Sequence, residues 1–459
     1  MMRRLLVFGC ASGIAAAAET DIASQRLVGA ALLDGAAYAT VASLTDQVGS
    51  RLAGTPGAER AVVWALSAMK QAGLTHVHTE PVRVERWVRG EAEAALVAPF
   101  AHPLHVVALG GSVATPREGL EGELVEASSF EELKALGPRV AGRIVLLNRP
   151  MMRNGESFGG YGDVAPLRRF GAVEAARLGA RAVLIRSLGT GAYRLPHTGA
   201  MQYQEGVAKI PFAALAAEDA ELLHRALAQG VAQVRLRLTC HLDGEVDSAN
   251  VIGEVKGRER PDEIVLLGAH LDSWDLGTGA IDDGAGCGMV IAAARLIAQL
   301  GAPRRTVRVA LFMNEERGLS GARAYAADHR AELVRHVAAL EADSGAGRPL
   351  GFAVVGGAAS VALLSRWAAP LSGLRASAVQ TTEEAGADLI PLHEAGVPAF
   401  MLRQDLSSYF DWHHTAADTL DKIDPFELHL ATAAIAVVAR AAAESVDLLP
   451  RISAGHQQQ

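Results

Sequence analysis

The sequence predicts an α/β fold, in which a mostly parallel, doubly wound sheet with helices on both faces is interrupted by an inserted β-rich domain. From residue 248 onward, apolar runs of strand length alternate with Ala-rich helical stretches, as in sheets that are covered on both faces. Residues 106–245 instead carry short β-like runs separated by Gly and Pro. The chain has 459 residues, more than the ~250–300 that one hydrophobic core usually holds.

The first part of the main domain is expected at residues 19–105. Residues 26–75 have a helical pattern with a turn at 54–57, after which an Ala-rich helix runs to Met69. Residues 77–88 alternate between apolar and polar types, as a strand does.

The insertion is expected at residues 106–245. Its short strands come first. A helix that starts near Gly171 follows and leads into a strand, and a further strand and helix come after them. The strands read directly from the pattern are 106–109, 122–125, 143–147, 210–214 and 231–239.

The main domain resumes at residues 246–453 and ends in a loose tail at 454–459. The expected strands are 249–255, 264–269, 307–313, 337–341, 352–355 and 399–402. The expected helices are 285–300, 319–329, 361–368 and 425–449.

The N-terminus has the pattern of a secretory signal peptide. A positive start and a short apolar stretch are followed by Ala16 and Ala18, small residues that suit a cleavage site. We therefore expect residues 1–18 to be removed near Ala18 and the protein to be secreted or periplasmic. Lipid attachment at Cys10 is the weaker alternative, because the apolar stretch before it is very short.

Composition excludes some classes of partner. The formal net charge is −8 and no basic run occurs, which argues against a nucleic-acid partner. No later segment offers about 18 uninterrupted apolar residues, so no transmembrane segment is expected. Cys240 and Cys287 could pair in an oxidising compartment or remain free thiols, and the sequence leaves both alternatives open.

Acidic and His residues follow the apolar runs of the main domain repeatedly, at the points where strands end. The carboxyl ends of strands are where α/β sheets hold ligands, and residues two apart in a strand, such as His270 and Asp272, face the same side. The set comprises His270, Asp272, Asp282, Asp283, Glu315, Glu316, Asp343, His413 and His414.

These residue types suit hydrolysis assisted by two metal ions. Two zinc ions about 3.5–4 Å apart can lower the pKa of a shared water toward ~7. One carboxylate must bridge the two ions, and each ion needs further His and carboxylate ligands. A neighbouring Glu that binds no metal can take the proton from the water and pass it to the leaving amine.

Each motif taken alone has an ordinary structural explanation. His241-Leu242-Asp243 repeats the triplet at 270–272 but lacks a continuous apolar strand before it, so we interpret it as linker. Glu-Glu pairs usually lie on solvated helix surfaces, yet Glu315 and Glu316 follow a strand that looks buried. The ordered set, rather than any one motif, predicts a metal site.

The motifs GAHLDSWDLGTGAIDDGAG, NEERG, LEADSG and YFDWHHTAADT resemble those of peptidase family M28, and most closely its secreted dipeptidases. The resemblance extends to the insertion, where GAVEAARLGARAVLIRS and PHTGAMQYQEGVAKIP are similar to a protease-associated domain. It implies a zinc-peptidase fold, two zinc ions per chain, a peptide substrate and a homodimer.

The resemblance also implies a role for each matching residue. His270 and Asp343 would bind one zinc ion, Glu316 and His414 the other, and Asp282 would bridge them. Glu315 would be the general base, and Asp272 would orient His270. Asp282 is preferred to Asp283, and His414 to His413, from their places in the motifs. His413 is a further candidate, as a residue of the pocket or as support for a ligand. Tyr409 could donate to the oxyanion or serve as a packing aromatic. Asp388 and Asp405 could lie near the substrate amine or cap turns.

Three alternatives remain open at this level. An aminopeptidase acting on longer peptides would use the same ligands, and so would a deacylase or deamidase. A non-catalytic binding protein of the same fold would have lost ligands, whereas here every ligand and the base are present.

Overall fold

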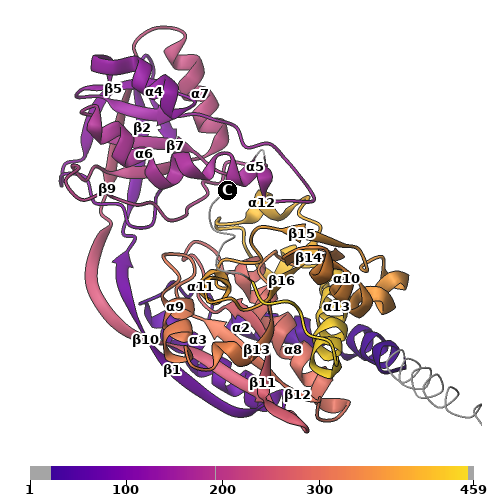
Figure 1. The fold of residues 1–459 in the computed structure, drawn as a ribbon. Helices are drawn as coiled ribbons and strands as arrows, with labels where there is room; N and C mark the ends of the chain where they lie inside the picture. Colours follow the sequence, from indigo (N-terminus) through magenta and orange to yellow (C-terminus); the bar gives the residue numbers. More distant parts are fainter. Residues whose placement is uncertain (1–21, 192, 453–459) are drawn as a thin grey trace, which may run out of the picture.

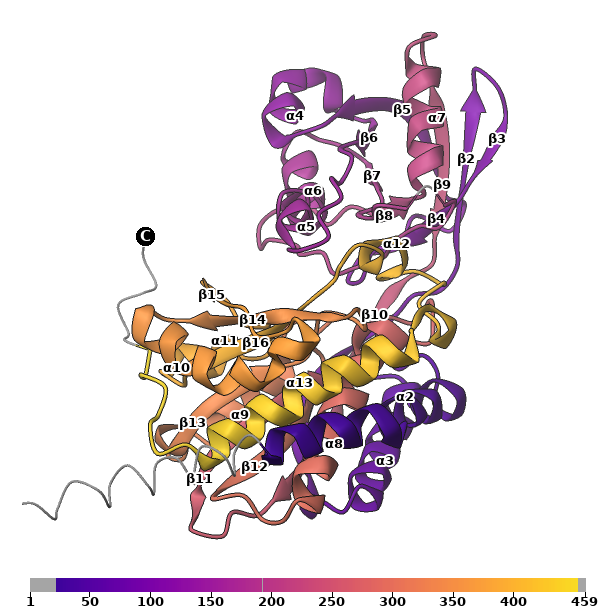
Figure 2. The same ribbon diagram turned by 90° about the vertical axis from the view of Figure 1, so that its right-hand side faces the viewer.

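The computed structural model describes residues 22–191 and 193–452, so the expected signal peptide and the expected tail at 454–459 lie outside the described residues. Two mixed sheets form the framework, with one below the other in Figure 2. The first sheet contains, in spatial order, β1 (Thr75–Val88), β10 (His241–Val255), β12 (Arg305–Phe312), β11 (Arg260–His270), β13 (His336–Glu341), β16 (Ala399–Gln404), β14 (Pro349–Val355) and β15 (Val379–Thr382).

Only the centre of the first sheet matches the mostly parallel sheet that we expected. β12, β11, β13 and β16 run parallel to one another. β10 is antiparallel to both β1 and β12, and β14 is antiparallel to β16. The sheet is mixed at one edge because β1 and β10 pair antiparallel, and at the other because β14 runs against β16.

Helices cover both faces of this sheet because its central strands are apolar on both sides. Along β11, Val265 and Leu267 contribute to one core and Leu266 to the other, as the period of a strand requires. One face packs against α2 (Ala36–Gln47), α3 (Pro56–Gln71), α8 (Ala285–Gln299), α10 (Ala358–Ala368) and α13 (Pro425–Glu444); the other packs against α9 (Ser320–Asp328) and α11 (Ile390–Glu394). Figure 2 shows α13, α8 and α2 together on their side of the sheet.

Local sequence explains where two of these helices begin. Thr55 caps α3 by accepting a hydrogen bond from the amide of Ala58, and Pro56 occupies the first turn. Asp424 caps α13 in the same way, accepting from the amides of Phe426 and Glu427. α13 is apolar and long enough to cross a membrane, but 67% of that stretch is buried inside the fold, as befits a core helix. The helices Ile22–Asp34 and Ala36–Gln47 are long and apolar enough to cross a membrane only when they are taken together, and they are bent by 43° at their junction.

The second sheet contains β3 (His102–Leu104), β2 (Ala92–Ala98), β9 (Gln233–Leu238), β5 (Leu120–Ala127), β6 (Ile144–Leu147), β7 (Ala182–Arg186), β8 (Phe212–Leu215) and β4 (Val106–Ala108), in this order. It packs against α4 (Phe130–Leu136), α6 (Ala165–Arg177) and α7 (Ala217–Leu227). The expected boundary at 105/106 is therefore misplaced, because β2 and β3 pair inside this sheet. Their short, partly exposed runs carry no signal that separates them from the preceding strand.

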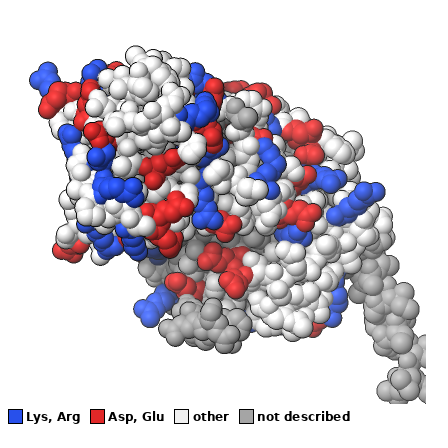
Figure 3. Space-filling view, turned by 90° about the horizontal axis from the view of Figure 1, so that it is seen from above, with Lys and Arg blue, Asp and Glu red and all other residues white. Residues whose placement is uncertain are grey.

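β1 and β10 connect the two parts as a long antiparallel ribbon (Figure 1), paired from Thr75 and Glu254 to Val88 and His241. The triplet 241–243 lies at the exposed start of β10, in this connecting ribbon, and outside the candidate metal site. Cys240 and Cys287 are both buried free thiols. On the face shown in Figure 3, acidic and basic side chains are interspersed.

Candidate metal centre

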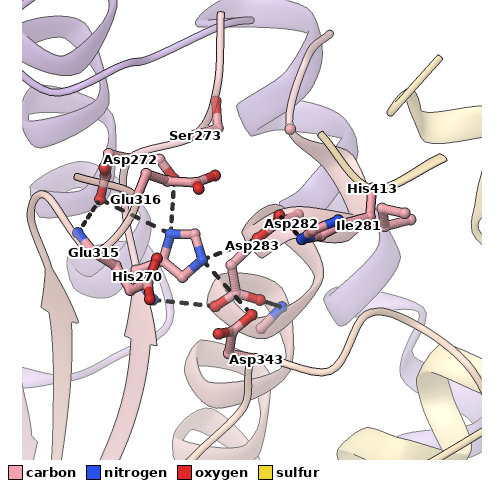
Figure 4. A network of polar contacts seen from close by, with 12 residues as sticks. His270, Asp272, Ser273, Ile281, Asp282, Asp283, Glu315, Glu316, Asp343 and His413 are labelled. Carbon is pink, nitrogen blue, oxygen red and sulfur yellow. Dashed lines mark hydrogen bonds and ion pairs between the residues drawn. The ribbon is translucent and has the colours of Figure 1, made fainter. Parts of the chain in front are cut away.

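Three adjacent parallel strands bring candidate ligands to one edge of the first sheet. β11 ends at His270, while Glu315 and Glu316 follow β12 and Asp343 follows β13. The register pairs His270 with Phe312 and Gly268 with Glu341. Because the strands are parallel, the residues just beyond their carboxyl ends converge (Figure 4).

Asp282 lies between the two candidate His ligands. It comes from the segment Ala280–Gly284 that leads into α8, where its backbone is not helical. Its Oδ1 lies 3.0 Å from Nε2 of His270, and its Oδ2 lies 3.2 Å from Nε2 of His414. The structure therefore brings together all five residues expected to bind metal, since Asp343 Oδ1 lies 3.7 Å from His270 Nε2 and Glu316 Oε2 lies 3.1 Å from His414 Nε2.

The donors fit zinc. His270, Asp282 and Asp343 present ligand atoms within 4.8 Å of one another, and so do Asp282, His413 and His414. Imidazole and carboxylate are ligands that zinc uses in proteins. Oε1 of Glu316 is buried without a hydrogen-bond partner among the residues that the structure describes, which is costly for a carboxylate unless a cation satisfies it.

The pKa shifts of the cluster also favour a bound cation. Burial raises the pKa of Glu316 to about 7, and the carboxylate of Asp282 adds to the rise. Burial alone would lower the pKa of His270 and of His414, but their carboxylate neighbours raise both well above the usual value. Burial raises the pKa of Asp282, yet its hydrogen bonds to these two imidazoles bring it well below the usual value. A cluster of buried carboxylates held together by imidazoles is one that a divalent cation would stabilise.

Asp283 and Asp282 have different hydrogen-bond partners. Oδ2 of Asp283 accepts a hydrogen bond from the amide of His270 at 3.1 Å, and Oδ1 accepts from the amide of Gly286 at 3.0 Å. Asp283 thus ties the end of β11 to the start of α8, and its oxygens are occupied. Both oxygens of Asp282, by contrast, face imidazoles.

The expected role of Asp272 needs correction. Nδ1 of His270 hydrogen-bonds to the backbone carbonyl of Asp272 at 3.0 Å, whereas the Asp272 carboxylate lies 3.9 Å from that nitrogen. Oδ1 of Asp272 instead accepts from the amides of Asn314 and Glu315, at 2.7 and 3.1 Å. The carboxylate therefore holds the turn that carries Glu315, and the backbone orients the imidazole.

His414 and His413 both lie near Asp282, with Nε2 of His413 3.5 Å from its Oδ2. Their rings stack with centroids 3.5 Å apart. His414 alone of the two contacts Glu316, and its backbone and Nδ1 both bond to Thr198 of the second sheet's domain, at 2.9 and 3.3 Å. Burial lowers the pKa of His413 well below the usual value, so this imidazole is neutral and remains a second ligand candidate.

The other expected residues have different surroundings. Tyr409 is buried and lines the cavity beside the cluster, and burial raises the pKa of its hydroxyl well above the usual value. Asp388 is buried, and neither of its oxygens is hydrogen-bonded to any described residue; its neighbours Gly386 and Ala387 line the cavity. Asp405 caps a turn by accepting from the amide of Ser407, whereas its neighbours Gln404 and Leu406 line the cavity.

Two residues that sequence reasoning missed position the Asp282 segment. Arg51 is fully buried and donates to the carbonyls of Leu271, Thr278 and Gly279 at 2.6 to 2.8 Å. Oδ1 of Asp418 accepts from the amides of Ala280 and Ile281 at 2.8 and 2.7 Å. The only signal for Asp418 was its place after His414 in the motif, and nothing local marks Arg51.

The cluster opens into a cavity of about 550 Å³ that lies between the two parts of the chain. The first sheet's domain contributes Glu315, Asp343 and Tyr409, and the second contributes Phe158 and Tyr161. α12 (Tyr409–Trp412) lies at this junction (Figure 1), where the ring of Phe410 stacks on Tyr161. A substrate in this cavity would touch both parts.

Known proteins are similar to this chain in sequence. A model of peptidase family M28 matches residues 250–439. Carboxypeptidase Q of Homo sapiens is 37% identical over 416 residues, which cover 90% of this chain and 86% of that protein. Aminopeptidase YwaD of Bacillus subtilis is 26% identical over 416 residues, which cover 87% and 83% of the two chains.

Solved structures are also similar to the structure of this chain. The crystal structure of a peptidase M28 precursor from Shewanella amazonensis has a TM-score of 0.92 at 41% identity, covering 95% of this chain and 99% of that chain. BSAP, a zinc aminopeptidase from Bacillus subtilis, has a TM-score of 0.66 at 23% identity, covering 91% and 97%, and shares the fold.

Proposed function

The chain belongs to peptidase family M28 and is a metallopeptidase, and from this premise we propose that it is an exopeptidase with two zinc ions that hydrolyses dipeptides and other short peptides with a free N-terminus. The observation that carries the proposal is the position of Asp282, whose two oxygens face His270 and His414 separately. One carboxylate shared in this way suits a pair of ions.

His270 and Asp343 would hold one zinc ion, Glu316 and His414 the other, and Asp282 would bridge them. Glu316 is assigned as a ligand on the family resemblance, and its Oε2 lies 3.1 Å from Nε2 of His414. His413, whose Nε2 lies 3.5 Å from Oδ2 of Asp282, remains a second candidate. When bound, zinc supplies Lewis-acid chemistry: it polarises a peptide carbonyl and makes water a nucleophile at neutral pH.

Glu315 is proposed as the general base. It lines the cavity beside the cluster, and Asp272 fixes its backbone. Burial raises the pKa of its carboxyl well above the usual value, with the Asp343 carboxylate adding to the rise, so it can hold a proton between two steps. It would take that proton from the attacking water and give it to the leaving amine.

Tyr409 is proposed as the donor to the carbonyl oxygen. Its hydroxyl stays protonated because burial and the nearby carboxylates raise its pKa. An O–H directed at an oxygen that gains negative charge stabilises the transition state more than the substrate.

Short peptides are favoured because the second sheet's domain forms one wall of the cavity. The identity to carboxypeptidase Q, at 37%, also exceeds the 26% to an aminopeptidase. An aminopeptidase acting on longer peptides is the alternative, since it needs the same metal cluster.

Product analysis tests the proposal. The protein is incubated with dipeptides, their N-acetylated forms and pentapeptides, and the released amino acids are quantified by mass spectrometry. We expect cleavage of free dipeptides and little cleavage of the other two sets. Efficient trimming of pentapeptides would favour the aminopeptidase, and release from acetylated peptides would indicate a broader amidase.

Two further parts of the proposal rest on the resemblance and the N-terminal pattern. We propose export with removal of residues 1–18, which N-terminal sequencing of protein from the native host tests. We also propose a homodimer, and light scattering that gives the 48.0 kDa of a single chain would contradict it.

A further inference from the structure

Arg403 is a cation in the part of the cavity that the first sheet forms. It lies on β16, its side chain is 16% exposed, and it lines the same cavity as the candidate ligand Asp343. Among the described residues, the one acid within 4.0 Å of its guanidinium is Glu156, whose Oε2 lies 3.9 Å from Nη2. That distance is too long for a hydrogen bond, and the Glu156 side chain is itself 79% exposed. The guanidinium can therefore bind an anion that enters the cavity.

Two other Arg side chains of low exposure are paired more closely. Arg305 pairs with Glu263 at 2.5 Å, and Arg308 pairs with Glu254 at 2.7 Å. Neither of these Arg residues lines the cavity. Because a largely buried charge without a close partner is costly, Arg403 is a position at which an anionic ligand would stabilise the protein.

The register of the first sheet places Arg403 close to the candidate metal site. β13 and β16 are parallel neighbours, and Glu341 pairs with Met401. Asp343 lies two residues beyond the first member of this pair, and Arg403 lies two residues beyond the second. Both therefore follow the pair at the same level of the sheet, where neighbouring strands lie about 4.8 Å apart.

β14 leaves room beside Arg403 for a side chain of the substrate. This strand lies between β16 and β15, and it presents Gly351 opposite Arg403 and Ala353 opposite Met401. On its other side, Ala353 pairs with Gln380 of β15, which also lines the cavity. Because the middle strand carries little or no side chain at these positions, a ligand can approach the guanidinium across the face of the sheet.

The N-terminal residue of a bound dipeptide is the one that lies on this side of the cavity. The acids of the metal cluster attract its amine, and they belong to the first sheet's domain, as Arg403 does. Ser344 follows Asp343 and lines the cavity, and its Oγ is buried without a hydrogen-bond partner in the described part of the chain. A Glu side chain spans about 5 Å from Cα to its carboxylate oxygens, given bonds of about 1.5 Å. This length is comparable with the spacing of the neighbouring strands.

We infer that Arg403 binds the side-chain carboxylate of an N-terminal Asp or Glu and so gives the enzyme a preference for dipeptides with an acidic first residue. The inference rests on the proposed peptidase function and names a substrate class for that site. A guanidinium binds a carboxylate through two parallel, charge-assisted hydrogen bonds. The amide of Gln has the same shape but carries no charge and has one acceptor oxygen instead of two.

The test compares kcat/KM for the dipeptides Glu-Ala, Gln-Ala and Lys-Ala. The zinc-loaded wild-type protein and the Arg403→Gln, Arg403→Lys and Arg348→Gln variants are measured. Arg348 is the matched control, because it is an exposed Arg directly before β14 and does not line the cavity. Zinc content and thermal unfolding of each variant report whether it folds.

We expect the wild type to cleave Glu-Ala at least about 10-fold more efficiently than Gln-Ala, the scale of a hydrogen bond to a charged group. Arg403→Gln should bring this ratio close to one, because it should lower kcat/KM for Glu-Ala more than for Gln-Ala. Arg403→Lys should keep part of the preference, and Arg348→Gln should keep all of it.

Three results would overturn the inference. One is a wild-type ratio near one. Another is more efficient cleavage of Lys-Ala than of Glu-Ala, which would show that the exposed acids Glu156 and Glu384 of the cavity determine the preference. The third is an equal loss of activity on Glu-Ala and Gln-Ala in Arg403→Gln, since a residue that only supports the fold would act on both. A wild-type protein that cleaves none of the three dipeptides would instead refute the proposed function.

Discussion

Asp282 Oδ1 lies 3.0 Å from Nε2 of His270, although the two residues are 12 positions apart in the chain. The other oxygen of Asp282 faces His414, which comes from the opposite end of the main domain. One side chain therefore joins ligand candidates from two sides of the site.

His270→Ala should lose zinc. Removal of a ligand should lower the affinity by more than the ~10–100-fold typical of residues that only support a ligand. The matched control is His241→Ala, which changes the same His-Leu-Asp triplet where it is exposed on β10. Competition with a chelating dye measures both variants; equal zinc affinity in the two would exclude His270 as a ligand.

Glu315→Gln should lower kcat by about 1,000-fold, the scale of a lost general base, while zinc content stays at the wild-type level. Gln keeps the size of the side chain and cannot take the proton. Glu316→Gln, one residue further, should instead lower zinc content. Turnover by Glu315→Gln at the wild-type rate would refute the assignment.

Arg51→Met should destabilise the fold strongly. It would leave the buried carbonyls of Leu271, Thr278 and Gly279 without their donors, and each unsatisfied group costs about 1–3 kcal/mol. Urea unfolding should therefore show a loss of at least about 3 kcal/mol. Arg60→Met is the control, because within the described part of the chain Arg60 donates only to the carbonyl of Val48; a similar loss in both variants would contradict this role.

The contact between His329 and Glu80 should make stability depend on pH. Burial lowers the pKa of His329, but Glu80 and Glu332 raise it overall above 6.5. A raised folded pKa stabilises the fold fully below the unfolded pKa, and this contribution is lost as pH rises through the folded pKa. Glu80 depends on pH in the opposite way. Burial raises the pKa of its carboxyl, but its hydrogen bonds to His329 and His78 lower that pKa overall. The stability that Glu80 contributes is therefore lost only as pH falls through the lowered pKa.

Glu80→Gln should therefore lower Tm more at about pH 6 than at about pH 9. Asp262→Asn, at an exposed carboxylate, removes the same charge and serves as the control. Differential scanning calorimetry at the two pH values measures the effect. An equal change in Tm at both pH values would show that the protonated form of His329 does not contribute.

The sequence predicted the parts of the fold and site that depend on local pattern. Apolar runs located the central strands, and the residues at their ends, such as His270 and Asp343, lie together because parallel strands align their carboxyl ends. The choice of Asp282 over Asp283 rests on its place in the motif and stays a prediction, while the structure adds that Asp283 accepts from two backbone amides.

Contacts between distant segments could not be predicted in this way. Arg51 reaches carbonyls about 220 positions away, and nothing near it in the sequence marks it as buried. Thr198 supports His414 from the second sheet's domain, which only the tertiary structure reveals. The pairing of β2 and β3 in the second sheet, and the antiparallel edges of the first, likewise depend on where the returning chain lies.

Zinc stoichiometry tests the central claim most directly. Inductively coupled plasma mass spectrometry on the zinc-loaded, desalted protein should give about two zinc ions per chain, as expected for a carboxylate-bridged pair, and fewer in an Asp282→Asn variant. A zinc content near zero in the wild-type protein, or an Asp282→Asn variant with the full wild-type content, would contradict the assignment of a zinc pair bridged by Asp282.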